Sequence, residues 1–201
     1  MPAPAAYAIA DVTAAILAGG EGARVGGQDK GLLPLAGENL IARVSSAMRA
    51  QAGALLICAN RHEETYAAFG AVVGDALPGY RGPLAGIAAA LATCTTSWLL
   101  TVPVDCPDPP RDLGSRLLAS AIAAGTSLAA AHDGERAQPL FAIYRRELAE
   151  ACSDALVRDL PVWRWQRDAG AAVADFSGLA SHFVNLNTPE EFRAWEQAKH
   201  D

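Results

Sequence analysis

A segment near the N-terminus combines several glycines with two cationic side chains. Residues 17–30 read LAGGEGARVGGQDK, in which five glycines accompany Arg24 and Lys30. Glycine lets backbone N–H groups approach phosphate oxygens closely, and the two cations can offset the charge of a triphosphate. The composition therefore predicts a phosphate-binding loop. The alternative interpretation is a glycine-rich turn with a solvated arginine and lysine.

This loop matches neither of the two commonest phosphate-binding motifs. A Walker A loop needs a lysine directly after its second glycine, whereas Gln28 follows Gly27 here. A dinucleotide-binding fingerprint that began at Gly20 would need a glycine where Val25 stands. The pattern therefore disfavours both a kinase-type ATPase and an NAD-dependent enzyme.

An aspartate follows an apolar segment in the middle of the chain. Residues 97–107 read SWLLTVPVDCP, which predicts a buried strand that leads directly to Asp105. A carboxylate is a hard oxygen ligand for Mg²⁺, which binds few protein groups and keeps phosphate oxygens or waters as its other ligands. Asp105 is therefore the predicted metal ligand. An aspartate that caps the next helix is the alternative.

Two further polar residues follow predicted strands. Asn60 comes after the apolar residues 54–59, and Asp75 comes after residues 72–74. An asparagine can pair with a base edge, and a carboxylate can accept two hydrogen bonds from the amino edge of guanine or bind a ribose. Both residues are candidates for nucleotide recognition, with a turn residue and a helix cap as the respective alternatives.

The elements that position these residues follow from the apolar pattern. Short apolar segments alternate with amphipathic stretches, which predicts a Rossmann-like three-layer α/β fold with a mainly parallel central sheet. An antiparallel element is predicted in the C-terminal half, where the turn at Asp133 and Gly134 precedes a strand. Ligands of such sheets bind beyond the carboxyl ends of the strands. The predicted strands cover residues 14–18, 54–59, 72–74, 98–102, 128–131, 139–144 and 171–174, and the predicted helices cover residues 39–49, 84–92 and 110–123, with a last helix that starts at Thr188 and Pro189.

The glycine-rich loop and the aspartate together resemble the two signatures of a nucleotidyltransferase superfamily. These are LAGGxxxR with a lysine after five further residues, and the PxD motif that ends at Asp105. The resemblance implies that Arg24 and Lys30 contact the nucleotide phosphates and that Asp105 carries the catalytic magnesium. Val25 stands where the guanylyl branch usually has methionine, an apolar exchange that leaves the phosphate ligands unchanged. The loop residues implied to wrap the nucleotide are Leu17, Ala18, Gly19 and Gly20.

Within this superfamily the chain resembles molybdenum cofactor guanylyltransferases. The segments ANRH at residues 59–62, the aspartate at position 75 and RGPLAG at residues 81–86 occur in the same order as in that family. The resemblance implies that Asn60 and Asp75 bind GTP. The cytidylyl relatives tend to show TAAG for LAGG and GLSAS for GPLAG, so this chain has the guanine forms of both motifs.

Two C-terminal segments extend the resemblance. HDGER at residues 132–136 and FVNLNTPE at residues 183–190 match family regions that face the pterin-side substrate. The resemblance therefore implies that Asn185 and Asn187 bind the acceptor. His132 as a general base is an alternative, but the attacking phosphate of the acceptor is already anionic, so a structural histidine is the favoured interpretation.

The implied reaction is attack of the molybdopterin phosphate on the α-phosphorus of GTP, which gives molybdopterin guanine dinucleotide and pyrophosphate. The implied cofactor is Mg²⁺, with Mn²⁺ as the alternative, and no covalent enzyme intermediate is expected. GTP and molybdopterin are the expected partners, and transient contact with molybdopterin-supplying and molybdoenzyme-maturation proteins is compatible with this role.

Two rival functions share parts of the pattern. A cytidylyltransferase acting on molybdopterin or on a sugar-like alcohol would have the same glycine loop and aspartate. A non-catalytic nucleotide or cofactor carrier could keep the same fold. The combination of Arg24, Lys30 and Asp105 argues against the carrier, because a carrier does not need to organise a leaving pyrophosphate.

Length and composition set the remaining expectations. The 201 residues predict a single domain over residues 13–201 after a disordered extension at residues 1–12. A net charge of −6 provides no basic surface for nucleic acid or an anionic membrane, and no signal peptide or membrane span is predicted. The expected location is the cytoplasm, where the four cysteines are predicted to be buried thiols without zinc-ligand spacing. Cys106 as a nucleophile is disfavoured because no histidine lies within four residues.

Overall fold

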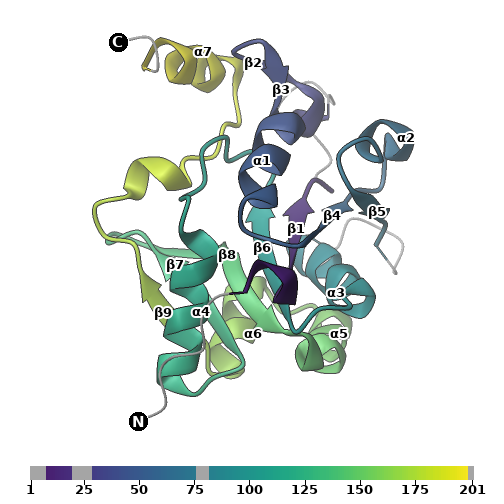
Figure 1. Cartoon of the computed structure of the whole chain (residues 1–201), viewed down its shortest axis with the longest axis vertical. Coiled ribbons are helices and arrows are strands. Elements are labelled where there is room, and N and C mark those ends of the chain that lie inside the picture. Colours follow the sequence, from purple (N-terminus) through teal and green to yellow (C-terminus); the bar gives the residue numbers. More distant parts are fainter. Residues whose placement is uncertain (1–7, 20–28, 76–81, 199–201) are drawn as a thin grey trace.

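The computed structural model describes residues 8–19, 29–75 and 82–198, and it shows strands that alternate with helices along most of the chain (Figure 1). The predicted α/β fold class is confirmed. The strands are β1 (Val12–Leu17), β2 (Pro34–Leu35), β3 (Glu38–Asn39), β4 (Ala54–Cys58), β5 (Ala71–Val73), β6 (Trp98–Pro103), β7 (Leu128–His132), β8 (Ala137–Arg145) and β9 (Ala172–Asp175). The helices are α1 (Leu40–Arg49), α2 (Glu63–Tyr66), α3 (Pro83–Thr93), α4 (Leu113–Ala124), α5 (Ala149–Val157), α6 (Val162–Asp168) and α7 (Pro189–Ala198).

Seven of these strands form one sheet in the order β5-β4-β1-β6-β8-β7-β9. β1 pairs in parallel with both β4 and β6, β4 pairs in parallel with β5, and β7 pairs in parallel with β9. β8 is antiparallel to both β6 and β7, so within the described residues it is the one strand of this sheet that runs against the others. The carboxyl ends of the six parallel strands therefore lie at the same edge, which we call the carboxyl edge, and the expected antiparallel element is β8.

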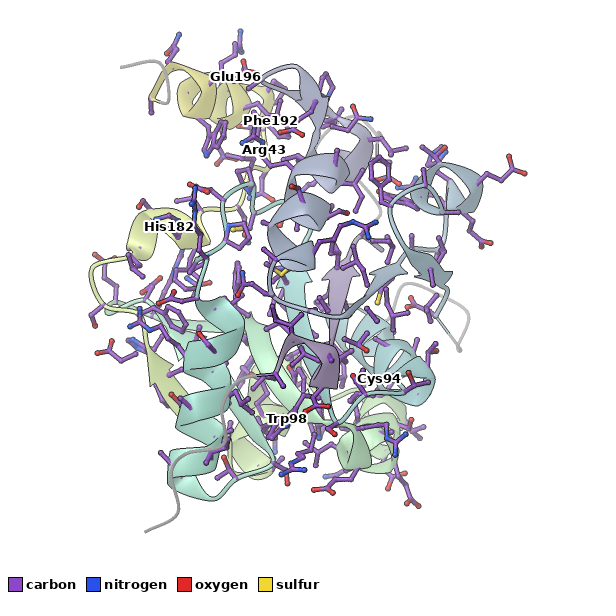
Figure 2. All side chains as sticks on the ribbon, viewed as in Figure 1. Arg43, Cys94, Trp98, His182, Phe192 and Glu196 are labelled. Atoms are coloured by element: carbon purple, nitrogen blue, oxygen red, sulfur yellow. The ribbon has the colours of Figure 1, made fainter. Side chains whose placement is uncertain are left out.

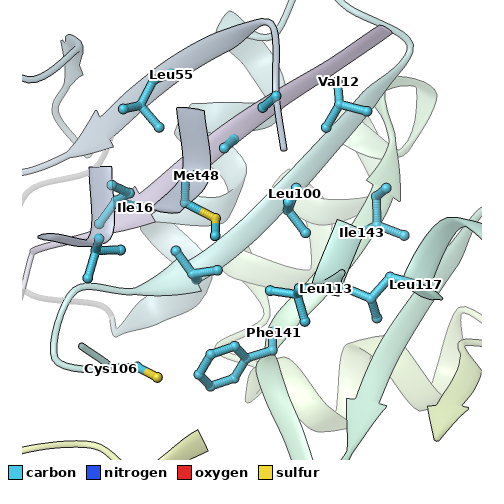
Figure 3. Packing of buried hydrophobic residues seen from close by; sticks show 14 of the residues in the cluster. Val12, Ile16, Met48, Leu55, Leu100, Cys106, Leu113, Leu117, Phe141 and Ile143 are labelled. Carbon is cyan, nitrogen blue, oxygen red and sulfur yellow. The ribbon is translucent and has the colours of Figure 1, made fainter. Parts of the chain in front are cut away.

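Helices cover both faces of the sheet and bury its alternating apolar side chains. On β1, Ala14 and Ile16 belong to a cluster with residues of α1 and α4, whereas Ala15 belongs to a cluster with residues of α3, α5 and α6. Figure 3 shows the first cluster, in which Met48 from α1 and Leu113 from α4 pack over Leu100 of β6. The alternation follows from the strand period of two, and it produces the predicted three layers.

The first strand begins earlier than the sequence pattern predicts. Val12 already pairs with Trp98 in β6, and Ile9–Asp11 form a 3-10 turn before it. The backbone N–H of Gly53 donates to the carbonyl oxygens of Ile9 at 2.7 Å and Val12 at 3.0 Å, which ties this segment to the chain before β4. The boundary predicted after residue 12 therefore falls inside β1, and residues 1–7 lie outside the described residues.

Three short helices and a small hairpin were not predicted. α2 lies between β4 and β5, while α5 and α6 follow β8 after a 3-10 turn (Arg146–Leu148) and cover one face of the sheet. β2 pairs with β3 in a two-stranded hairpin. Ala36 and Gly37 connect the two hairpin strands with φ values of 51° and 88°, the left-handed conformation that a two-residue hairpin turn requires. None of the helices in the described part of the chain has the length and apolar character needed to span a bilayer.

Candidate active site

Three predicted site residues from distant parts of the chain meet at the carboxyl edge. The Lys30 ammonium lies 3.1 Å from Oδ2 of Asp105 and donates to Oδ1 of Asn187 at 2.6 Å. The side chains of Lys30 and Asp105 are 20% and 17% exposed, so the pair is shielded but still reachable from solvent. We call these three residues the phosphate cluster. It joins the end of the glycine-rich loop, the end of β6 and the segment before α7.

Asp105 is fixed because the backbone on both sides of it is tied down. All six residues of β6 are buried, and the N–H of Val104 donates to the carbonyl of Leu17 at 3.1 Å, which continues the pairing with β1 past the end of the strand. The carbonyl of Asp105 accepts a hydrogen bond from the N–H of Leu186 at 2.8 Å. The metal-ligand candidate is therefore held at the edge of a fully buried strand, with the C-terminal segment bonded to its own peptide.

Lys30 opens a short 3-10 turn, Lys30–Leu32, that Asp29 caps. Oδ1 of Asp29 accepts hydrogen bonds from the N–H of Gly31 at 3.1 Å and from the hydroxyl of Tyr66 at 2.5 Å. Sequence reasoning missed both Asp29 and Tyr66. Asp29 could have been found as a capping aspartate directly before the lysine, whereas no local signal connects it to Tyr66, 37 residues away.

Asn60 and Asp75 form a second polar group at the same edge. The Asn60 amide donates to Oδ2 of Asp75 at 2.8 Å, and its Oδ1 accepts from the N–H of Asp75, also at 2.8 Å. A Cβ added to Gly19 would lie 3.5 Å from Nδ2 of Asn60, so the glycine loop leaves β1 beside these two residues. We call Asn60 and Asp75 the recognition pair. The amide of Asn60 holds the carboxylate of Asp75 at the carboxyl edge, where ligands of parallel sheets bind.

The remaining loop residues divide into those that the structure describes and those that it does not. Leu17 ends β1, and the N–H of Ala18 donates to the carbonyl of Cys58 at 2.9 Å, so β1 and β4 stay paired up to the loop. Gly20 and Arg24 lie outside the described residues, and their predicted phosphate contacts remain predictions.

The C-terminal segment reaches the phosphate cluster through a capped helix. Oε2 of Glu191 accepts from the N–H groups of Asn187 at 2.5 Å and Thr188 at 2.9 Å, while Oγ1 of Thr188 accepts from the N–H of Glu191 at 3.3 Å. The predicted start of the last helix at Thr188 and Pro189 is therefore confirmed. The second predicted acceptor residue lies next to it: Nδ2 of Asn187 donates to the carbonyl of Asn185 at 3.2 Å, and Oδ1 of Asn185 is buried without a hydrogen-bond partner among the described residues.

α7 itself is anchored on the β2–β3 hairpin. Phe192 packs with Leu35, Leu40 and Leu186, and Oε1 of Glu196 accepts from the N–H of Ala36 at 2.7 Å. In Figure 2, the labelled Phe192 and Glu196 lie next to Arg43 of α1, at the end of the molecule opposite Cys94 and Trp98. The hairpin follows directly after the turn that carries Lys30, so this contact fixes Asn187 and Lys30 relative to one another.

The HDGER segment forms the turn between β7 and β8. Burial opposes ionisation of Asp133, but hydrogen bonds from the N–H of Arg136, the amide of Gln138 and the N–H of Glu135 outweigh it and lower the pKa of this carboxyl. Asp133 is 5% exposed, and these three contacts all lie within the turn and the start of β8. It is therefore a structural residue of the hairpin.

His132 has a local partner in the same turn. Its Nδ1 accepts a hydrogen bond from the N–H of Gly134 at 3.1 Å, and Gly134 has a positive φ of 101° that allows this close approach. A ring nitrogen engaged in a turn supports the structural interpretation of His132 over the general base.

The four cysteines are free and buried, as predicted. The thiol of Cys106 donates to the carbonyl of His182 at 3.2 Å, and burial is the main reason why its pKa is raised to about 12. A thiol with such a pKa is not a nucleophile at neutral pH, which agrees with the sequence-based view of Cys106.

The donor set at the carboxyl edge fits magnesium better than a metal that needs a protein cage. Mg²⁺ is typically held by one or two carboxylates together with substrate phosphates and waters. Asp105 supplies one such carboxylate beside Lys30, and the described residues contain no group of three or more His, Cys, Asp or Glu side chains able to hold a metal. The partial exposure of Asp105 leaves room for ligands that come from the substrate.

The fold of the described residues is also found among solved structures. The structure is similar to the crystal structure of molybdopterin-guanine dinucleotide biosynthesis protein A from Archaeoglobus fulgidus, with a TM-score of 0.77, 20% identity and coverage of 94% of this chain and 98% of that one. At this identity the similarity establishes the fold.

Sequence comparison establishes the family. The family model described as the MobA-like NTP transferase domain matches residues 14–185. The molybdenum cofactor guanylyltransferase of Photobacterium profundum is 40% identical over 183 residues, which cover 90% of this chain and 94% of that protein. The enzyme of the same name from Serratia proteamaculans is 41% identical over 192 residues, covering 94% and 96%. The chain therefore belongs to the family of MobA-like NTP transferase domains.

Proposed function

We propose that the protein transfers GMP from GTP to molybdopterin or its molybdenum-loaded form, giving molybdopterin guanine dinucleotide and pyrophosphate. The observation that carries this proposal is the phosphate cluster, in which Lys30 contacts both Asp105 and Asn187. A lysine for the nucleotide phosphates, a carboxylate for the metal and an amide for the acceptor are thus within hydrogen-bonding reach of one another. The relatives at about 40% identity carry the corresponding name.

In the reaction, an oxygen of the terminal molybdopterin phosphate forms a bond to the α-phosphorus of GTP. The bond from this phosphorus to the oxygen that bridges it to the β-phosphorus breaks, and pyrophosphate leaves with the bonding electron pair. Both reactants are anions, so the main task of the protein is to position them and to neutralise charge. No protein nucleophile is needed.

Asp105 holds Mg²⁺ in this proposal, with Mn²⁺ as the alternative metal. When bound, the metal supplies positive charge to the nucleotide phosphates. Lys30 and Arg24 bind the same phosphates, and the hydrogen bond from Lys30 to Asn187 links the phosphate side of the site to the acceptor side. The ion pair between Lys30 and Asp105 keeps both groups aimed at one place before substrate arrives, which lowers the cost of ordering them on binding.

The recognition pair selects the nucleotide in this proposal. Asp75 accepts hydrogen bonds from the N1 and N2 edge of guanine, while Asn60 keeps the carboxylate oriented through the hydrogen bond at 2.8 Å. Cytosine does not present the same two donors, so the binding of CTP would leave this carboxylate unpaired. Asn185 and Asn187 bind the acceptor, and both residues are only partly buried, so their side chains are accessible to it.

The test is pyrophosphate release by the purified protein with magnesium, molybdopterin and either GTP or CTP. Release with GTP alone is the expected result. Release with CTP alone would move the protein to a cytidylyltransferase role. Release with neither nucleotide, in a protein that still binds GTP, would favour a carrier.

A further inference from the structure

The hydrogen bond between Tyr66 and Asp29 connects the interior of the protein to the start of the turn that carries Lys30. Tyr66, the last residue of α2, is fully buried, and its hydroxyl donates to Oδ1 of Asp29 at 2.5 Å. The same oxygen accepts from the N–H of Gly31. The residues on both sides of Lys30 are therefore tied together by one carboxylate oxygen, which is held by one buried phenol.

The packing around Gly31 reinforces this connection. A Cβ added to Gly31 would come within 3.1 Å of a methyl of Val104 and 3.2 Å of the Tyr66 ring, and it would overlap the Tyr66 hydroxyl. The turn is thus packed between the Tyr66 ring and Val104, the residue before Asp105. Any shift of the phenol would move the backbone of Lys30 relative to the carboxylate that Lys30 contacts.

From this geometry we infer that Tyr66 is a positioning residue for Lys30 in the proposed nucleotidyl transfer. It does not touch the substrate and acts only through Asp29 and the 3-10 turn. Burial is the main reason why its pKa lies far above the ordinary value, and the hydrogen bond to Asp29 adds to the shift, so the phenol remains a proton donor throughout the working pH range. This inference rests on the proposed role of Lys30 in binding GTP.

A purely structural role for Tyr66 makes a different prediction. If the buried hydroxyl only stabilises the fold, its removal should lower the free energy of unfolding and leave the GTP affinity unchanged. Tyr144 provides the matched control, because it is equally buried and its hydroxyl accepts from the amide of Gln166 at 2.7 Å. Tyr144 stacks on Trp165 of α6, in the layer on the other face of the sheet from Tyr66.

The experiment measures the dissociation constant of GTP by titration calorimetry for Tyr66→Phe, Tyr144→Phe, Lys30→Ala and the double variant Tyr66→Phe with Lys30→Ala. We expect Tyr66→Phe to weaken GTP binding about tenfold, the range of one lost hydrogen bond to a charged group. We expect no change for Tyr144→Phe. In the Lys30→Ala background, adding Tyr66→Phe should have no further effect, because the lysine that it positions is gone.

A conservative variant of the intermediate residue separates geometry from charge. Asp29→Asn keeps a side-chain oxygen that can accept from Tyr66 and Gly31, and we expect it to bind GTP within about threefold of the wild type, since one neutral hydrogen bond is weaker than a charged one. Asp29→Ala removes the acceptor and should weaken binding as much as Tyr66→Phe.

The outcomes distinguish this inference from the function on which it rests. If Lys30→Ala weakens binding but Tyr66→Phe behaves like Tyr144→Phe, the positioning role is overturned and the role of Lys30 stands. If Tyr66→Phe weakens binding equally with and without Lys30, the hydroxyl acts by another route and the inference is again overturned. If Lys30→Ala itself leaves GTP affinity unchanged, the proposed role of Lys30 fails and the inference fails with it.

Discussion

The two polar groups at the carboxyl edge are built in different ways. The phosphate cluster of Lys30, Asp105 and Asn187 gathers residues up to 157 positions apart, and its ion pair is largely shielded from solvent. The recognition pair of Asn60 and Asp75 comes from the ends of the neighbouring strands β4 and β5, only 15 positions apart, and its hydrogen bonds are exposed. The first group depends on the whole fold, and the second depends on one parallel strand pair.

From this difference we expect the phosphate cluster and the recognition pair to have different roles. Charge neutralisation benefits from a shielded position, because electrostatic interactions are stronger away from bulk water. Base selection needs only a few oriented donors and acceptors at an accessible edge. We therefore expect changes in the phosphate cluster to affect the rate of transfer most strongly, and changes in the recognition pair to affect mainly the choice of nucleotide.

The largest expected effect is that of Asp105→Asn. This variant keeps the shape of the side chain but loses the charge that we propose binds the metal. Turnover should therefore fall by about a thousandfold, the range found when a group that stabilises a transition state is removed. The measurement is pyrophosphate release at saturating substrates. Thermal unfolding is the control: loss of the shielded ion pair with Lys30 should lower the unfolding temperature, but the protein should remain folded at the assay temperature. Turnover close to that of the wild type would remove Asp105 from the mechanism.

Lys30→Ala should have the next largest effect. Loss of the ammonium removes the proposed charge-assisted contact to the nucleotide phosphates, and GTP binding should weaken by about 10- to 100-fold. Binding of guanosine, which has no phosphates, provides the comparison in titration calorimetry and should not change. A dissociation constant for GTP equal to that of the wild type would contradict the phosphate role of this lysine.

Asp75→Asn should change selectivity more than rate. The amide replaces one acceptor by a donor, so the preference for GTP over CTP should fall by about tenfold, the effect of one mispaired polar group. Competition between the two nucleotides in the pyrophosphate assay measures this ratio. An unchanged ratio together with a large loss of turnover would mean that Asp75 belongs functionally with the phosphate cluster.

The smallest expected effect is a change in the free energy of unfolding at acidic pH. It originates at Asp133, away from the phosphate cluster and the recognition pair. The pKa of Asp133 is lowered in the folded protein, so the ionised carboxylate contributes stability above its ordinary pKa, and this contribution is lost as the pH falls through the folded value. Asp133→Asn should therefore flatten the loss of stability below about pH 4, since an unperturbed aspartate titrates near there. Denaturant unfolding at neutral pH and at about pH 3 measures the difference. If the wild type and Asp133→Asn lost the same free energy of unfolding between the two pH values, the stabilising role of the Asp133 carboxylate would be contradicted.

Sequence reasoning reached the local features and missed the long-range contacts. The buried strands that end at Leu17 and Pro103 were predicted because apolar runs before glycine and proline are local signals. The helix start at Thr188 and Pro189 was predicted because both residue types favour the first turn of a helix. The contact between Tyr66 and Asp29 was not predicted, because nothing in the sequence around either residue specifies its partner.

Several residues of the site could be predicted from the sequence, but the contacts between them could not. The motif that ends at Asp105 and the segment around Asn187 were each singled out, yet only the fold shows that Lys30 contacts both. The short helices α2, α5 and α6 were missed because four, nine and seven residues give too few turns for a clear periodic pattern. Gly20 and Arg24 lie outside the described residues, so the structure assigns them to neither polar group.

The most direct test of the central claim follows the fate of each phosphate of GTP. The protein is incubated with magnesium, molybdopterin and GTP that is radiolabelled at either the α- or the γ-phosphate, and the products are separated. We predict that the α-label appears in a molybdopterin dinucleotide and the γ-label in pyrophosphate, with both transfers lost in Asp105→Asn. Release of the γ-label as inorganic phosphate, or an α-label that never joins molybdopterin, would contradict guanylyl transfer.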